Sequence, residues 1–318
     1  MTGLGKRLKG GLLLLAAFAG LGQPLPLAAQ KTSEATAPAA AARPAAPRFP
    51  RPAIWLIEDE DTKIYLFGTV HVFPASLQWR SPALNRIIEE ADELVMETAE
   101  ASAAEMAGSD EMAMMQLGKS VPILERVSPA ARPALRAALD ATSMPMEFFD
   151  QLHTWAVAFI LTGLQIGQSF GEDGQPTALS GAEEVLGQLF RRSKRPISGV
   201  ETAEEQLGVF ATMPQGAQRR FLESTVTGGD ADEPEQDLSG EKWAQGDVES
   251  IEREMRSLPP ELYEPLLTRR NRNWTAWLVR RMQRPGKVLF AVGAGHLAGA
   301  DSVQTMLAAR GIQARRID

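Results

Sequence analysis

Strand-like runs lie near both ends of the chain and enclose a long middle with helical periodicity. Two short runs of β-branched and aromatic residues, "AIWLIED" (53–59) and "KIYLFGT" (63–69), are joined by a polar turn and predict a β-hairpin. A third run of this kind, "KVLFAVG" (287–293), follows only near the end of the chain. Remote segments must therefore share one sheet. This predicts an α/β (α+β) fold with a mixed central sheet built from N- and C-terminal segments and a large helical middle.

The middle of the chain has its own start and stop signals. Ser81 as N-cap and Pro82 at the first helical position predict a helix that leads into a short strand, "ELVMET" (93–98). Helical patterns with long apolar stripes follow, and one of them, at 147–165, contains His153. A strand-like run, "RPISGVE" (195–201), separates these helices from a second helical stretch.

Two of the three histidines share a local context. His71 ends "LFGTVH" and His296 ends "FAVGAGH", so each follows an apolar strand-like run and has a glycine three residues before it. Polar groups at strand ends gather where the loops of an α/β sheet meet. Both histidines are therefore candidate ligands for a divalent metal, whereas His153 has the pattern of an ordinary helix residue.

Two glutamates also follow strand-like runs. Glu97 ends the apolar part of "ELVMET", and pairing of that strand with the strand before His71 would place the two side chains together. Glu201 has the same context, at the start of the helical run "TAEEQLGVF". A carboxylate can serve a hydrolytic metal site as third ligand or as general base. The roles of third ligand and general base both remain open for these glutamates. A simpler interpretation of Glu201 is that its charge only complements the helix dipole.

The N-terminal region predicts export from the cytoplasm. Residues 1–29 have a positive start, a short apolar run and small residues near Ala29, which is typical of a cleaved signal peptide. An uncleaved N-terminal anchor is the alternative. The Ala/Pro-rich residues 30–52 predict an extended linker, and 53–318 a folded domain. We expect a periplasmic or secreted protein with no membrane span in the mature chain.

Composition excludes several classes of function. Residues 1–52 carry seven Lys or Arg and one Glu, which leaves a formal net charge of −13 for the rest of a chain whose total is −7. Such an acidic body argues against nucleic-acid binding, which needs a basic face. The absence of cysteine excludes disulfides, thiolate zinc sites and cysteine nucleophiles.

These motifs resemble the TraB/GumN family, which shares its fold with the Tiki metalloproteases. The matching segments include "YLFGTVHVFP", "ADELVMETAE", "ISGVETAEEQLGVF", "LLTRRNRNWTAWL" and "FAVGAGHLAGADSV", and together they span about 53–317. The resemblance implies a mixed α/β fold and metal-dependent peptidase activity. One departure is visible, because many relatives have Gly-x-Asp where this chain has "GAEE", with Glu183 at the acidic position.

The resemblance also implies roles for individual residues. His71 and His296 would be metal ligands, and Glu97 would be a further ligand or the base that activates water. Arg270 and Asn271 match the Arg-Asn pair of the family and would stabilise a developing oxyanion.

The resulting prediction is an extracytoplasmic metal-dependent hydrolase of the peptidase type. Its cofactor would be a divalent ion (Mn²⁺, Co²⁺ or Zn²⁺), and its substrate a peptide or a small molecule. The alternative is a non-enzymatic protein that binds haem or metal, or an accessory protein of surface polysaccharide export or signalling. No feature of the sequence specifies an oligomeric state.

Overall fold

A computed structural model describes residues 50–318 apart from 100–109, 119, 170–178, 229–239 and 259. The predicted signal peptide at 1–29 and almost all of the predicted linker lie outside the described residues. Among the residues that are described, no helix combines the length and apolar character that a membrane crossing needs.

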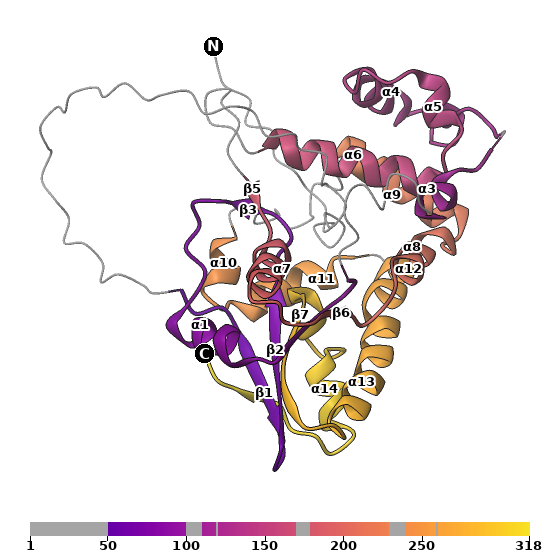
Figure 1. Cartoon of the computed structure of the whole chain (residues 1–318). Helices are drawn as coiled ribbons and strands as arrows, with labels where there is room; N and C mark the ends of the chain where they lie inside the picture. Colours follow the sequence, from indigo (N-terminus) through magenta and orange to yellow (C-terminus); the bar gives the residue numbers. More distant parts are fainter. Residues whose placement is uncertain (1–49, 100–109, 119, 170–178, 229–239, 259) are drawn as a thin grey trace, which may run out of the picture.

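Six strands of the described chain form one mixed sheet (Figure 1). Their order is β6-β4-β7-β2-β1-β8, with bounds β1 Ile54–Glu58, β2 Thr62–Thr69, β4 Glu93–Met96, β6 Ile197–Gly199, β7 Gly286–Gly293 and β8 Arg315–Arg316. The predicted hairpin is present, because β1 pairs antiparallel with β2. The strands β2, β7, β4 and β6 run parallel to one another. The predicted α/β fold with a mixed sheet from remote segments is therefore confirmed.

One predicted pairing is wrong. The strand before His71 does not pair with the strand before Glu97, because β7 lies between β2 and β4. The physical reason is the length of the pairing. β7 pairs with β2 over all eight residues of both strands, whereas β4 is only four residues long and offers β2 fewer ladder hydrogen bonds.

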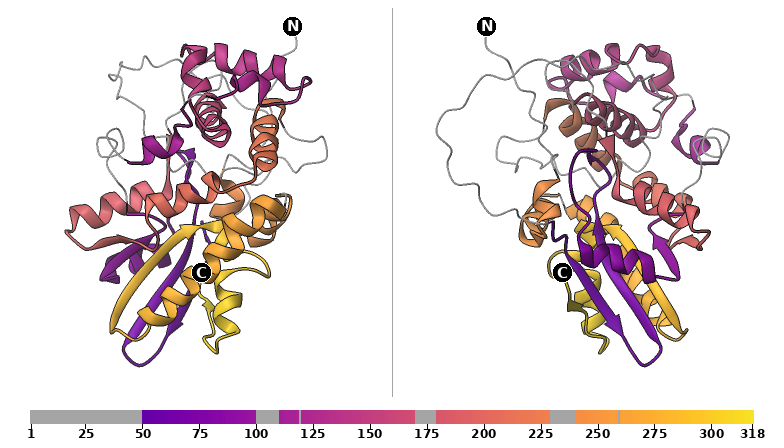
Figure 2. Two further views of the ribbon diagram at one scale, coloured as in Figure 1. Left: turned by 90° about the vertical axis from the view of Figure 1, so that its right-hand side faces the viewer. Right: turned by 60° about the vertical axis from the view of Figure 1, so that its left-hand side comes forward.

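Helices cover both faces of the sheet (Figures 1 and 2). On one face α1 (Pro82–Glu90), α7 (Ala182–Arg192) and α10 (Glu241–Ala244) share a core with Leu289 and Ala291 of β7. On the other face α13 (Arg269–Arg281) and α14 (Val303–Ala308) pack against Val288 and Phe290. Successive side chains of β7 point to opposite faces of the sheet, so this strand packs against an apolar layer on each face.

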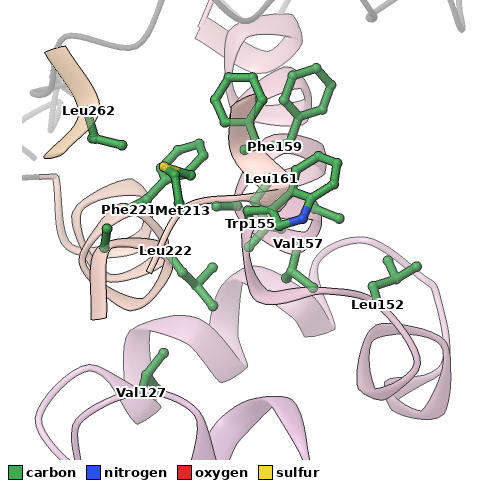
Figure 3. Packing of buried hydrophobic residues seen from close by; sticks show 14 of the residues in the cluster. Val127, Leu152, Trp155, Val157, Phe159, Leu161, Met213, Phe221, Leu222 and Leu262 are labelled. Atoms are coloured by element: carbon green, nitrogen blue, oxygen red, sulfur yellow. The ribbon is translucent and has the colours of Figure 1, made fainter. Parts of the chain in front are cut away.

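The helical middle forms a separate layer with its own apolar core. Its helices are α3 (Asp110–Met115), α4 (Arg132–Asp140), α5 (Met146–Asp150), α6 (Thr154–Ser169), α8 (Ala203–Ala211), α9 (Gln215–Thr227), α11 (Val248–Arg256) and α12 (Pro260–Tyr263). Trp155 of α6 stacks on Phe210 of α8 with 5.8 Å between ring centroids, and Phe221 of α9 lies beside Phe210 at 6.4 Å. Figure 3 shows side chains of this core, including Trp155 and Phe221.

The single helix predicted at 147–165 is two helices. α5 ends at Asp150 and α6 begins at Thr154, so His153 lies between them and not inside a helix. At the break the backbone of 151–153 pairs with the backbone of 115–117, and the Arg126 guanidinium donates hydrogen bonds to the carbonyl oxygens of Asp150 and Leu152. These carbonyls would otherwise accept the next bonds of a continuous helix.

Candidate functional site

Four side chains meet at the carboxyl edge of the sheet. His71 follows β2, Glu97 follows β4, Glu201 follows β6, and His296 lies in the 3-10 turn after β7. These four strands are parallel, so their carboxyl ends share one edge. This is the edge at which open α/β sheets bind ligands.

Arg270 lies among these side chains and uses every N–H of its guanidinium. Nε donates to Glu201 Oε2 at 3.1 Å, and Nη2 donates to Glu97 Oε2 at 2.5 Å and to the other oxygen of Glu201. Nη1 donates to the carbonyl of Leu266 at 3.3 Å and to His296 Nε2 at 3.1 Å. A guanidinium has five N–H groups, so none is left for a substrate unless one of these bonds is exchanged.

A local distortion of the backbone positions Arg270. The π-helical turn Glu264–Thr268 directly precedes α13 and contains Pro265. Proline lacks the N–H that an α-helix uses, and wide turns of this kind are frequent at functional sites. The carbonyl of Leu266 then accepts from the Arg270 side chain. The ring of Trp274, one helical turn later, lies 4.7 Å from the guanidinium carbon.

Glu97 is a buried, ionised carboxylate. Its Oε1 accepts from the backbone N–H of Gly293 at 2.8 Å, and its Oε2 accepts from Gln206 Nε2 at 3.1 Å as well as from Arg270. Burial alone would raise the pKa of Glu97. The charges of Arg270, His296 and His71 and the Gly293 hydrogen bond outweigh burial and lower that pKa to about 2.

Glu201 shares Arg270 with Glu97 but behaves differently. Burial raises the pKa of Glu201 above its ordinary value, and the nearby charge of Glu97 acts in the same direction. The charge of Arg270 and its hydrogen bonds, with a further bond from Trp274 Nε1 at 3.1 Å, only partly offset this rise. One guanidinium therefore serves two carboxylates, and Glu201 is the one that takes up a proton more readily.

His296 is fully buried and is held in one tautomer. Its Nδ1 lies 2.6 Å from Asn271 Oδ1, and an amide oxygen only accepts, so Nδ1 carries the proton. The Asn271 amide is fixed in turn, because its Nδ2 donates to the Asp301 carbonyl at 2.7 Å. Burial and then the charge of Arg270 lower the pKa of His296 to about 3. The imidazole is neutral, and its Nε2 atom lies 3.7 Å from Glu97 Oε1.

His71 is held through its Nδ1 atom by Glu183. His71 Nδ1 lies 3.0 Å from Glu183 Oε1, which also accepts from the Thr69 hydroxyl. Burial would lower the pKa of His71, but the charge and hydrogen bond of Glu183 outweigh it and raise that pKa to about 9. His71 Nε2 is buried and has no hydrogen-bond partner in the described chain. Gly181 permits this approach of α7, since a Cβ there would lie 2.5 Å from the carbonyl oxygen of His71.

The structure gathers the predicted site residues into one charged cluster. The charge of His71 acts on the pKa of both Glu97 and His296, and Arg270 joins Glu97, Glu201 and His296 directly. Asn271 contacts His296 and belongs to its support.

Three supporting residues were not identified from the sequence. Gln206 donates a side-chain hydrogen bond to Glu97, and Trp274 donates one to Glu201. Glu183 contacts His71, a role that its sequence context does not indicate. A signal for Gln206 existed, because the capping box of Thr202 and Glu205 fixes the start of α8 and thus the face on which Gln206 lies.

The profile of the TraB/PrgY/gumN family matches residues 53–316. The chain belongs to this family. Neither the curated proteins nor the solved structures compared with the chain gave a match. The TraB/PrgY/gumN match covers both Gly-x-x-His motifs and every residue of the cluster.

The donor atoms of this TraB/PrgY/gumN site are of the kinds that bind a metal ion, but the side chains that carry them are not grouped as a metal ion requires. Both imidazoles have Nδ1 bound to an oxygen, from Glu183 or Asn271, and this is how supporting residues orient metal-ligating histidines. His71 Nε2 is moreover a buried polar atom without a partner. As they stand, however, no three His, Asp or Glu side chains of the described residues form a group that could hold an ion. Arg270 is bonded to two of the three expected ligands.

Proposed function

We propose that this chain is a metal-dependent hydrolase of amide or ester bonds, with His71, His296 and Glu97 as the ligands. The observation that carries the proposal is the matched orientation of the two histidines. Each is fixed through Nδ1, and each directs Nε2 away from its support. A protonated His71 Nε2 that is buried without an acceptor is costly, and an ion that replaces this proton removes the cost.

The two carboxylates would take different parts in the reaction. A divalent ion, when bound, supplies Lewis acidity and makes a bound water acidic near neutral pH. Glu97 has a strongly lowered pKa and stays charged, which suits a ligand better than a base. Glu201 has a raised pKa and is the better acceptor for a proton from the attacking water. In the metal-free protein Arg270 holds both carboxylates in place, and its contact with a developing oxyanion would require exchange of one present partner.

The proposed place of action is outside the cytoplasm, in the periplasm or as a secreted protein. The support is the charged start, short apolar run and small-residue cleavage zone of residues 1–29. N-terminal sequencing of protein from the extracytoplasmic fraction should begin close to Gln30. An intact Met1 on protein from the cytoplasmic fraction would contradict this location.

The activity can be tested with defined metals and matched variants. The purified protein is treated with a chelator, reloaded with Mn²⁺, Co²⁺ or Zn²⁺, and assayed against peptide and ester libraries. We expect turnover that the chelator abolishes, that the double variant His71→Ala/His296→Ala lacks, and that Glu184→Gln retains. Glu184 is exposed and lies beside Glu183, so it controls for a change of charge at this helix end.

Two outcomes would decide against the hydrolase. One is an absence of turnover with every metal. The other is stoichiometric binding of haem by the wild type without turnover, which would favour the non-enzymatic binding protein. Metal content, measured by mass spectrometry on wild type and the double variant, shows separately whether the two histidines bind an ion.

A further inference from the structure

We infer that Arg270 is an internal cation that competes with the metal: it occupies the ligand atoms in the metal-free protein and must release His296 and Glu97 before an ion binds. This inference rests on the proposed metal site. Its first support is geometric, because one guanidinium bonds to the inward-facing atoms of two expected ligands, His296 Nε2 at 3.1 Å and Glu97 Oε2 at 2.5 Å.

The competition follows from the tautomer of His296. Asn271 Oδ1 holds the proton on Nδ1, and the Asn271 amide cannot turn without losing its bond to the Asp301 carbonyl. The only lone pair that His296 offers in this orientation is therefore the one on Nε2. A lone pair that accepts from an N–H of Arg270 cannot coordinate an ion at the same time, so the two cations exclude each other there.

Arg270 is also built to move without losing its charge partner. Each terminal nitrogen divides its two N–H groups between one ligand and one other acceptor. Nη1 joins His296 and the Leu266 carbonyl, and Nη2 joins Glu97 and Glu201. With Nε also bonded to Glu201, three of the five bonds do not involve a ligand. The guanidinium can give up the other two and remain paired with Glu201, beside the Trp274 ring.

Competition of this kind has a measurable consequence. Binding of an ion to the wild type includes the cost of breaking two hydrogen bonds of a charged donor and of placing a second cation beside the guanidinium. Removal of the guanidinium should therefore strengthen metal binding. A hydrogen bond to a charged group corresponds to about ten-fold or more in affinity. The opposite expectation, that Arg270 only arranges the ligands, predicts weaker binding when Arg270 is replaced.

The test is calorimetric titration of MnCl₂ and of ZnCl₂ into the chelator-treated protein. Arg270→Gln removes the charge, and Arg270→Lys keeps the charge but not the forked donor. Arg269→Gln is the matched control, because Arg269 is the exposed neighbour on the same helix. We expect wild type and Arg269→Gln to bind equally, Arg270→Gln to bind about ten-fold tighter or more, and Arg270→Lys to lie between them. Equal or weaker binding by folded Arg270→Gln would overturn the inference.

Failure of the inference and of the proposed site can be told apart. Loss of binding in His296→Ala confirms that the proposed ligands hold the ion, whatever Arg270 does, and binding that His296→Ala leaves unchanged refutes both ideas. Arg270→Gln leaves two buried carboxylates without their partner, so a second readout uses the wild type alone. In ¹⁵N NMR of the zinc-saturated protein, Arg270 Nη1 should lose its bond to His296 while Nε keeps its bond to Glu201. Unchanged Nη1 signals at saturation would also overturn the inference.

Discussion

Replacement of Glu183 by glutamine should change how the stability of the metal-free protein depends on pH. In the folded protein burial lowers the pKa of His71, but the charge and hydrogen bond of Glu183, with a smaller effect of Glu97, outweigh it and the net pKa is raised from 6.5 to about 9; both side chains are largely buried. Each pKa unit corresponds to about 1.4 kcal/mol, so the protonated pair contributes about 3 kcal/mol to the free energy of unfolding. A raised pKa stabilises the fold below the unfolded value near 6.5, and this stabilisation is lost as the pH rises through about 9.

The assay is urea unfolding of wild type and Glu183→Gln with chelator present, at about pH 6 and about pH 10. Glu183→Gln should lose about 3 kcal/mol relative to wild type at the lower pH and much less at the higher pH. Glu184→Gln, which changes an exposed neighbour in the same way, should show no such difference between the two values. An equal loss for Glu183→Gln at both pH values would refute the ion-pair reasoning, since loss of packing alone does not depend on protonation of His71.

Three further substitutions test the framework around the site by urea unfolding. Phe290→Ala removes a fully buried ring from β7 and should cost about 3–5 kcal/mol; a loss below about 1 kcal/mol would contradict the central position of this strand. Thr202→Ala removes the capping box of α8 and should cost about 1 kcal/mol, whereas Thr202→Ser should cost little. Trp243→Phe removes the 2.7 Å bond from Nε1 to the Gly68 carbonyl and should cost about 1 kcal/mol, and an unchanged stability would show that this bond is dispensable.

Local signals in the sequence were sufficient for the hairpin, the helix beginning at Pro82 and the strand ends that carry the site. Ser81 does cap its helix, accepting from the N–H of Leu84 at 3.0 Å. Strand ends are predictable because the end of an apolar run in the sequence lies within a residue or two of the end of pairing. The convergence of His71, Glu97 and His296 then depends on the three strands being parallel and adjacent in the sheet.

The order of the strands was not predictable from the same signals. β2, β4 and β7 are all apolar runs in the sequence, so this pattern does not show which of β7 and β4 lies next to β2. The order depends on how long the strands are and how helices cover them, which are properties of the assembled sheet. The break at 151–153 has a similar cause. There the backbone pairs with 115–117 and accepts from the Arg126 side chain, and both partners are distant in sequence from the break.

The position of Glu183 shows how the start of a helix can place an acid beside a histidine of the site. Gly181 lets the start of α7 lie against the backbone of His71, and the Ala182 N–H donates to the Val70 carbonyl at 3.0 Å. The backbone of this helix end is thus fixed by contacts that do not involve the acidic side chain. From that fixed start Glu183 reaches His71 Nδ1 at 3.0 Å. Because the helix end is set by Gly181 and the Ala182 bond, the acid at the second position of this helix is placed beside His71 and supports the orientation of its ring.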